Sequence, residues 1–389
     1  MSEMYDVVII GGGPAGLAAA IYVGRAQRKT LLIEKGSYGG RINDTREIRN
    51  YPGVISDSGA GLMEKFKAHA QSYPTNEWKR TTVTGIVKQE DGSFLVQTKR
   101  RGDFLTHCII LDTGTKPRML GIPGELEFAG HGVAYCATCD AEFFKGKDIY
   151  VLGAGDQAIE EADYLTGFAN KVTIIVLHEE GHLDCNEVAA QTAYQNPKID
   201  FVWNSTLQEI KGDEEVTSLV IKNVVDQTIQ EVKADGIFFF VGMVPQTELV
   251  QDLLACDDKG YILVNEKKET NIAGIYAIGD CTQTFLRQVV TSAADGAIAA
   301  TASERYVKEK KQIDAILTPD SGKVAFLFYQ PYENEQIEKM SMKEEQLKDT
   351  YRVIRQDITR QTLLYDRLNI KASPAIAYYE NGKLMKIEN

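Results

Sequence analysis

Two glycine-rich turns constrain the fold of this 389-residue chain more than any other feature of its sequence. The first turn, "GGGPAG", follows the apolar run "VVII" and leads into a helix of small residues predicted to end near Arg25. A second apolar run ends in Glu34, about twenty residues further on. The glycines of such a turn make the tight bend, let a pyrophosphate approach the backbone, and let helix and strand pack closely. Here they are Gly11, Gly13 and Gly16. The pattern predicts a dinucleotide-binding fold whose helix N-terminus binds phosphate while Glu34 accepts from ribose hydroxyls.

The same pattern returns in "VLGAGDQAIEEADYL". The residues at its turn positions are Gly153, Gly155 and Ala158. A strand is predicted from Val172 to Leu177, and "HEEGH" (178–182) follows it. Glu179 would meet the adenosine ribose, where a carboxylate accepts from a free 2′-hydroxyl and repels a 2′-phosphate. The letters also fit HExxH, which binds zinc on a helix. Because the segment follows a buried strand and contains a glycine, we favour the ribose interpretation and predict no metal.

A third feature is the cysteine pair in "VAYCATCD", Cys136 and Cys139. Zinc would need a second pair of ligands, and the other four cysteines are scattered singly. A structural disulfide closing so short a loop would stabilise little, and six cysteines in a chain of this length favour a reducing compartment. We therefore interpret the pair as a redox dithiol, whose thiolate is favoured when it faces a helix N-terminus.

Composition excludes several classes of protein. A formal net charge of -12 argues against a nucleic-acid partner, because phosphate binding needs clustered Lys and Arg. The longest uncharged stretch, residues 7–24, contains three successive glycines and Pro14, and Asp6 precedes it. We therefore expect neither a membrane span nor a signal peptide, and a cytoplasmic location.

Further segments carry a family resemblance. They are "TGTKPR" (113–118), "FFFVGMVPQTEL" (238–249), "TNIAGIYAIGDCT" (270–282) and "RQVVTSAADGAIAA" (287–300). With the cysteine pair they resemble the low-molecular-weight flavin thioredoxin reductases, in the right order over about residues 5–308. The resemblance implies an α/β fold with two Rossmann-like domains. The FAD-binding domain would be discontinuous (1–115 and 246–308), and an inserted NAD(P)-type domain (116–245), with hinges near Lys116 and Pro245, would carry the dithiol.

The resemblance also implies functional residues. The expected FAD contacts are Gly11, Gly13, Pro14, Ala15, Gly16, Glu34, Arg41, Asn50, Gly114, Gly279, Asp280, Arg287, Gln288 and Val289. In the family the first cysteine attacks the partner disulfide and the second interacts with the flavin. These roles fall to Cys136 and Cys139, with Asp140 as the acid/base. Thioredoxin or a thioredoxin-like partner and a homodimer are expected on the same ground.

Two departures from the family affect the flavin and its electron donor. The arginine-bearing stretch that meets the 2′-phosphate of NADPH is replaced by "LHEEGHLDC", and Arg41 stands where a glutamine is usual. The first departure resembles the ferredoxin-dependent subgroup. Because Gly153, Gly155 and Ala158 are intact, NADH also stays open as the donor, whereas NADPH is not expected.

The tail, residues 321–389, resembles most of a thioredoxin fold. A strand at 324–328, a polar helix, a second strand and a closing hairpin are predicted, with Pro374 as the cis proline. No cysteine follows residue 281, so the tail cannot exchange disulfides. It would serve docking, dimerisation, spacing or stability. Residues 309–320, charged and ending in turn residues, are predicted as a linker.

These features predict an FAD-dependent disulfide reductase that passes electrons from ferredoxin or NADH through the dithiol to a thioredoxin-like protein. Two alternatives stay open. One is a dithiol oxidase that uses oxygen on the same scaffold. The other is an FAD-binding regulatory protein that acts through its C-terminal domain.

Overall fold

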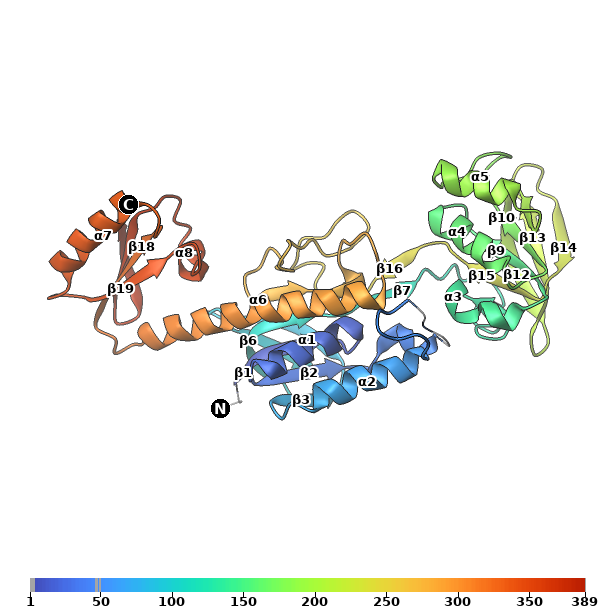
Figure 1. Cartoon of the computed structure of the whole chain (residues 1–389). Helices are drawn as coiled ribbons and strands as arrows, with labels where there is room; N and C mark the ends of the chain where they lie inside the picture. The colour runs from blue at the N-terminus through green and yellow to red at the C-terminus, as the bar shows by residue number, and fades with distance from the viewer. Residues whose placement is uncertain (1–3, 46–47, 49, 389) are drawn as a thin grey trace.

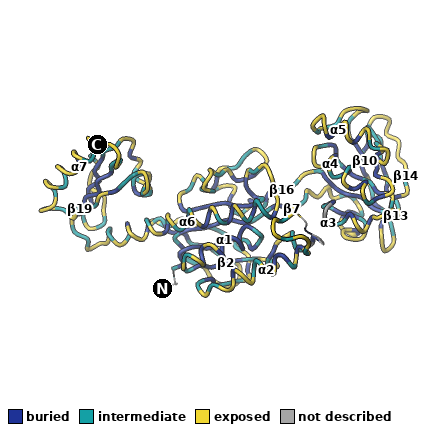
Figure 2. Tube along the Cα trace, in the orientation of Figure 1, coloured by how far each residue is buried: buried dark blue, intermediate teal, exposed yellow. Residues whose placement is uncertain are grey.

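The chain folds into three lobes that lie in a row (Figure 1). The first glycine turn joins β1 to α1 in the central lobe. The computed structural model describes residues 4–45, 48 and 50–388. Figure 2 shows a separate buried interior in each lobe, centred on its sheet. The three lobes are therefore separate packing units.

The central lobe is built on a sheet of order β3-β2-β1-β6-β5-β4, with β17 also paired to β6. β1, β2, β3, β6 and β17 run parallel, whereas β4 and β5 are antiparallel to their neighbours. The strands are β1 (Met4–Ile10), β2 (Thr30–Glu34), β3 (Asn76–Arg80), β4 (Val83–Lys88), β5 (Phe94–Thr98), β6 (Phe104–Leu111) and β17 (Ile275–Ala277). β1 and β2 are buried almost throughout, as their unbroken apolar runs require of strands covered on both faces.

Helices α1 (Pro14–Arg25), α2 (Gly59–Gln71) and α6 (Val289–Ile316) belong to this lobe. α1 and α6 approach closely because small residues line their contact. A Cβ built on Gly296 of α6 would lie only 2.2 Å from the carbonyl oxygen of Ala15. Two short 3₁₀ turns, η1 (Gly40–Asp44) and η3 (Gly279–Cys281), complete the end of the lobe where β1 and β2 finish.

The second lobe is entered through β7 (Thr115–Pro117) and left through β16 (Met243–Pro245), which pair antiparallel. Its parallel sheet has the order β11-β10-β9-β15-β8. These strands are β8 (Val133–Ala134), β9 (Asp148–Leu152), β10 (Lys171–Ile175), β11 (Ile199–Val202) and β15 (Gly236–Phe239). Its helical segments are α3 (Ala137–Asp140), η2 (Ala141–Phe144), α4 (Asp156–Leu165) and α5 (Glu187–Gln195). A separate antiparallel sheet comprises β12 (Ser205–Gly212), β13 (Val216–Asn223) and β14 (Ile229–Lys233). The hinges predicted near Lys116 and Pro245 fall on the β7–β16 ribbon, and β10 ends two residues before the predicted Leu177.

The third lobe has a four-stranded sheet of order β19-β18-β20-β21, with the first pair parallel and the other two antiparallel. Its elements are β18 (Lys323–Tyr329), α7 (Asn334–Leu347), β19 (Arg352–Asp357), α8 (Leu363–Arg367), β20 (Ala375–Glu380) and β21 (Lys383–Glu388). The Ser373–Pro374 bond is cis, as expected. Asn381 and Gly382 both have positive φ, as a two-residue hairpin turn of this kind requires.

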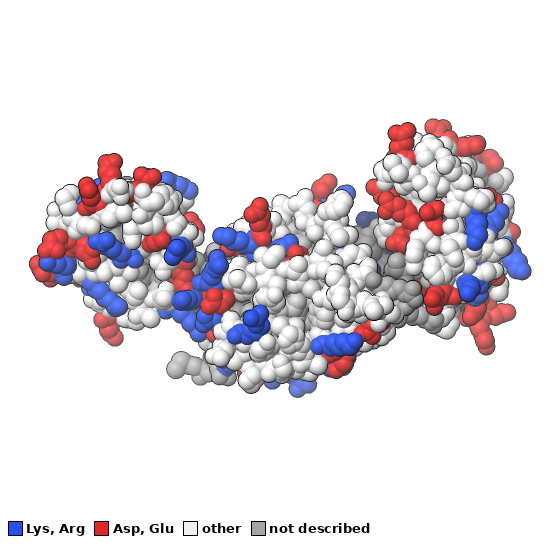
Figure 3. All heavy atoms as spheres, viewed as in Figure 1, with Lys and Arg blue, Asp and Glu red and all other residues white. Residues whose placement is uncertain are grey.

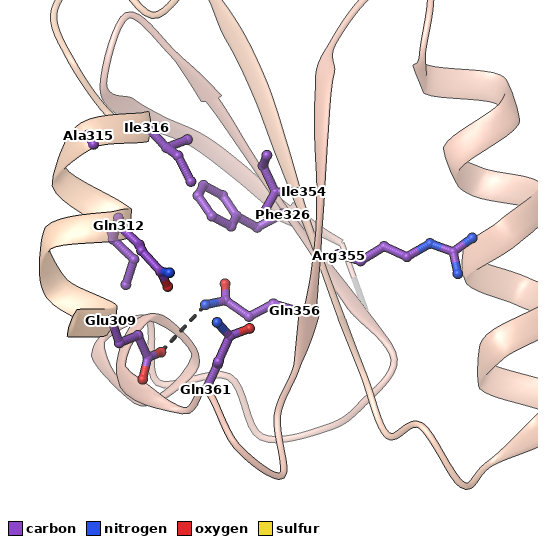
Figure 4. Close-up of a pocket in the computed structure, with 10 residues that line it drawn as sticks. Glu309, Gln312, Ala315, Ile316, Phe326, Ile354, Arg355, Gln356 and Gln361 are labelled. Carbon is purple, nitrogen blue, oxygen red and sulfur yellow. Dashed lines mark hydrogen bonds between the residues drawn. The ribbon is translucent and has the colours of Figure 1, made fainter. Parts of the chain in front are cut away.

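The segment predicted as a linker is largely helical. α6 continues to Ile316 and enters the third lobe, where Ile313 is 3% exposed and packs with Phe326 and Leu364. Glu309 also faces this joint (Figure 4). Its Oε1 accepts from the backbone N–H of Leu363 at 2.9 Å. Charge and turn residues predicted a boundary here, whereas the apolar residues at 313 and 316 pack against the core of the third lobe.

Candidate flavin and dithiol sites

The first glycine turn leaves no room for side chains. Gly11 has a φ of +107°, and a Cβ on it would lie 1.9 Å from the carbonyl oxygen of Asp112. A Cβ on Gly16 would lie 2.3 Å from the carbonyl oxygen of Gly11. Gly13 is the N-cap of α1 with no side-chain cap, and Pro14 follows it at the start of the helix. No side chain of the turn itself caps the helix N-terminus, which is favourable for an anionic group.

Glu34 lies beside this turn at the end of β2. Its Oε2 accepts from the N–H of Gly12 at 2.7 Å, and its Oε1 accepts from the N–H of Gly36 at 2.6 Å. The ring of Tyr38 covers Gly12, since a Cβ there would lie 2.6 Å from that ring. The carboxylate is thus held against the backbone of the turn, where the sequence predicted a ribose contact.

Asp112 was missed by sequence reasoning. It follows β6, and its Oδ2 accepts from the N–H of Gly16 at 2.7 Å. Burial raises the pKa of this carboxyl well above its usual range, and Glu34 and Asp280 add to the rise. Its position was a usable signal, because a polar residue that ends an apolar strand parallel to β1 lies at the same sheet edge as the glycine turn.

Asp280 and two arginines form the next part of the site. Burial raises the pKa of Asp280, against the opposing effect of Arg41 and Arg287. Arg41 donates to Thr115 Oγ1 at 3.1 Å. Arg287 lies over the Tyr261 ring, 4.1 Å from its centroid, and donates to the carbonyl oxygen of Thr282 at 3.2 Å. Two arginines from separate segments therefore lie near Asp280 at the end of the sheet.

The remaining predicted flavin residues converge on the same region. Asn50 Nδ2 donates to Gln288 Oε1 at 3.0 Å, although the two are far apart in sequence. Gln288 is the N-cap of α6 and Val289 is its first residue. Gly114, with a φ of +66°, leads from β6 into β7. Gly279 turns beside α1, because a Cβ on it would lie 3.2 Å from that of Ala15.

The dithiol segment lies in the second lobe. Cys136 is partly buried, disulfide-bonded, and occupies the N-cap position of α3. Ala137, Ala141 and Phe144 anchor the segment in the core of this lobe. Asp140 is the last residue of α3. The side chain of Cys139 lies outside the described part of the structure, so its pairing with Cys136 stays a prediction. Figure 1 shows that α3 and the first glycine turn belong to different lobes joined by β7 and β16.

The second glycine turn has the same construction as the first. Gly153 has a φ of +140°, and a Cβ on it would lie 2.5 Å from the carbonyl oxygen of Phe240. Gly155 is the N-cap of α4, and Ala158 is fully buried. A helix N-terminus favours a phosphate, but α4 begins with Asp156, whose Oδ1 accepts from the N–H of Asn186 at 2.6 Å.

The loop after β10 is not helical, so it lacks the geometry of a HExxH zinc site. His178 Nε2 lies 2.7 Å from Asp184 Oδ2, and the Asp184 N–H donates to the Ala154 carbonyl at 2.9 Å. Glu179 is exposed. No group of three or more His, Cys, Asp or Glu side chains that could hold a metal ion is found within residues 4–45, 48 and 50–388. The hydrogen bond between Asp184 and Ala154 connects the loop to the second glycine turn.

Comparison with known proteins identifies the family. Residues 5–296 match the pyridine nucleotide-disulphide oxidoreductase family. A thioredoxin reductase from Peptoclostridium acidaminophilum is 43% identical over 316 residues, which is 79% of this chain and 98% of the relative. The chain belongs to the low-molecular-weight thioredoxin reductase family.

Solved structures agree with this assignment. Lactococcus lactis thioredoxin reductase in the FR conformation is 43% identical with a TM-score of 0.64, and the match covers 78% of this chain and 99% of that one. The enzyme from Streptococcus pyogenes is 38% identical with a TM-score of 0.67, over 79% and 99% of the two chains. The chain is therefore a flavin disulfide oxidoreductase with two dinucleotide-binding domains, and its family implies FAD. None of the helices described for it is long and apolar enough to cross a membrane.

Proposed function

We propose that this protein reduces the disulfide of thioredoxin or a thioredoxin-like protein, with electrons that pass through FAD and the Cys136–Cys139 pair. The observation that carries the proposal is the disulfide-bonded Cys136 at the start of α3, on the same chain as a complete glycine cradle. The thioredoxin reductases among its relatives support the choice of substrate.

The first glycine turn fits FAD. A Cβ at Gly11 or Gly16 would overlap backbone oxygens, so the turn keeps the close approach that a pyrophosphate needs. Gly13, the N-cap of α1, has no side chain, and Glu34 beside the turn would accept from a ribose hydroxyl. The proposed FAD contacts are Gly11, Gly13, Pro14, Ala15, Gly16, Glu34, Arg41, Asn50, Gly114, Gly279, Asp280, Arg287, Gln288 and Val289. Bound FAD would supply two-electron chemistry between the donor and the dithiol.

The dithiol would act on the partner in two exchanges. The Cys136 thiolate attacks one sulfur of the partner disulfide, forms a mixed disulfide and releases the other sulfur. The Cys139 thiolate then attacks Cys136, which frees the partner as a dithiol and leaves a Cys136–Cys139 disulfide. Two electrons and two protons pass to the partner, and Asp140 serves as the acid/base for the thiol proton.

The dithiol must meet both the flavin and the partner. α3 lies in the second lobe, which is connected to the central lobe through β7 and β16 (Figure 1). Rotation about this ribbon would bring the dithiol to the flavin in one orientation and expose it in the other. The hinge would lie near Lys116 and Pro245.

The electron donor is proposed to be ferredoxin or NADH. The loop from Leu177 to Asn186 contains no Lys or Arg, and Glu179 and Glu180 would repel the 2′-phosphate of NADPH. Gly153 and Gly155 retain the geometry for a pyrophosphate, which supports NADH. A protein donor such as ferredoxin would not need this second turn.

We also propose a homodimer. α1, α2 and α6 border a groove of about 510 Å³ that includes four alanines of α1 and α6 together with Tyr22 and Val290. Figure 3 shows few charged side chains on this part of the central lobe. A second copy, packed through the same face, would cover it with the self-complementary contact of a twofold interface. Sedimentation should give a mass near twice that of the chain, and a Tyr22→Glu variant should be monomeric.

The first test follows the visible absorbance of the oxidised flavin without oxygen. NADH, NADPH or chemically reduced ferredoxin is added in separate runs, followed by oxidised thioredoxin. Bleaching by NADH or ferredoxin and recovery on adding thioredoxin are expected. Rapid bleaching by NADPH would contradict the proposed donor. In a separate run with oxygen, fast oxygen uptake on adding a small dithiol would indicate a dithiol oxidase. A flavin that no donor reduces would indicate a regulatory role.

A further inference from the structure

Asp112 fills a position between the N-terminus of α1 and η3. The residue is 8% exposed, and its Oδ2 accepts the N–H of Gly16 at 2.7 Å. A Cβ built on Gly13 would lie 2.9 Å from the same oxygen, and one on Gly279 would lie 3.2 Å from Oδ1. The carboxyl group thus occupies the interior of the glycine cradle.

The groups that face Asp112 are mostly acidic. Glu34 from the end of β2 and Asp280 from η3 both disfavour its ionised form, whereas the N–H groups of Gly16 and Gly13 favour it. The neighbouring Cys281 thiol is fully buried, and burial raises its pKa to about 11, so it is neutral near pH 7. The arginines of the site, Arg41 and Arg287, act on Asp280. With burial as the largest cause, the pKa of Asp112 lies well above its usual range.

A bound phosphate would favour the protonated form of Asp112 further. The inference rests on the proposed function, in which the cradle holds FAD. Its pyrophosphate would bring negative charge to the helix N-terminus that Asp112 already contacts. Two anionic groups so close together cannot both remain ionised at low cost, and the weaker acid keeps its proton. A protonated carboxyl can also donate a hydrogen bond to a phosphate oxygen.

We propose that Asp112 is a direct contact of the FAD pyrophosphate and that, at a pH where this carboxyl is ionised in the free protein, FAD binding is accompanied by uptake of a proton there. FAD affinity then depends on pH between the two titration points of Asp112, without and with FAD. Within that range the dissociation constant rises by up to about tenfold for each pH unit. Below the range the acid is protonated in both states, and affinity is constant.

The test measures FAD binding by cofactor-free protein from pH 5 to pH 9, through quenching of flavin fluorescence. Three proteins are compared: wild type, Asp112→Asn, and Asp6→Asn as the matched control. The amide introduced by Asp112→Asn is neutral at every pH and keeps an N–H donor. Asp6 is also a buried aspartate, but it lies at the other end of β1. Calorimetry of FAD binding in two buffers of different ionisation enthalpy counts the protons taken up.

The FAD affinity of wild type and that of Asp6→Asn should fall together as pH rises. Between the two titration points of Asp112, both proteins should take up a proton when FAD binds. Asp112→Asn should bind FAD independently of pH, and more tightly than wild type at pH 9. Parallel pH profiles for wild type and Asp112→Asn, or no proton uptake by wild type, would overturn the inference. Asp112→Ala, checked by circular dichroism, provides a second variant if the asparagine destabilises the fold. Wild type that binds no FAD at any pH would refute the proposed flavin site itself.

Discussion

The joint between α6 and the third lobe should weaken as pH rises, because of Glu309. Burial is the largest cause that raises the pKa of this carboxyl to about 7, from an ordinary value near 4.5. Gln312, Gln356 and Gln361 line the same cavity of about 360 Å³, and Gln356 Nε2 lies 3.5 Å from Glu309 Oε1 (Figure 4). Arg355, a cationic residue that also lines the cavity, pairs with Glu344 of α7, its Nε 2.7 Å from Glu344 Oε2, and Asp366 adds to the rise of the Glu309 pKa.

The sign follows from proton linkage. The folded state binds more protons than the unfolded state between pH 4.5 and pH 7, so the free energy of unfolding falls as pH rises through this range. At about 1.4 kcal/mol per pKa unit the upper limit is roughly 3 kcal/mol. Solvent screening of a carboxyl at an open cavity reduces the expected loss to about 1–2 kcal/mol.

Hydrogen exchange of β18 and β20 peptides measures this loss in wild type and Glu309→Gln. The ratio of the two rates at one pH cancels the intrinsic pH dependence of exchange. Wild type should be closest to the variant at pH 5 and exchange about 5–30 times faster than the variant at pH 8. The exposed Glu338→Gln on α7 is the control and should give a constant ratio. Equal ratios at pH 5 and pH 8 for Glu309→Gln would refute the reasoning.

Three further predictions concern the flavin, the dithiol and the joint. Cys139→Ser should keep its flavin absorbance but lose turnover with thioredoxin, and unchanged disulfide reduction would contradict the mechanism. Gly16→Ala should be purified with little FAD, because its Cβ would lie 2.3 Å from a backbone oxygen, whereas Gly36→Ala, with 3.5 Å to the nearest atom, should retain it. Ile313→Ala should destabilise the third lobe by about 2–4 kcal/mol, seen as faster exchange of β18, while flavin reduction by the donor continues as in wild type. Exchange of β18 in that variant as slow as in wild type would show that α6 does not stabilise the third lobe.

Much of the fold was predictable because its signals are local. The glycine turns need no tertiary information, since an apolar run, a turn without Cβ atoms and a helix of small residues are consecutive in the chain. The hairpin at Asn381 and Gly382 was predictable for the same reason. The role of residues 309–316 was not, because their charged pattern fits both a linker and a helix. Only the sheet of the third lobe, which Ile313 covers, decides between them.

Some residues of the candidate site were likewise predictable from local sequence, and others were not. The sequence by itself determined the two glycine turns, the acid after β2 and the cysteine pair, because each depends on residue type and spacing. Only the tertiary structure brought Asn50 to Gln288, set Arg41 and Arg287 around Asp280, and placed Asp112 inside the first turn. These residues come from separate segments, and parallel strand pairing aligns the ends of β1, β2 and β6 at one edge. A carboxyl acquires an unusual pKa there through burial and neighbouring charge, which no local pattern of residues records.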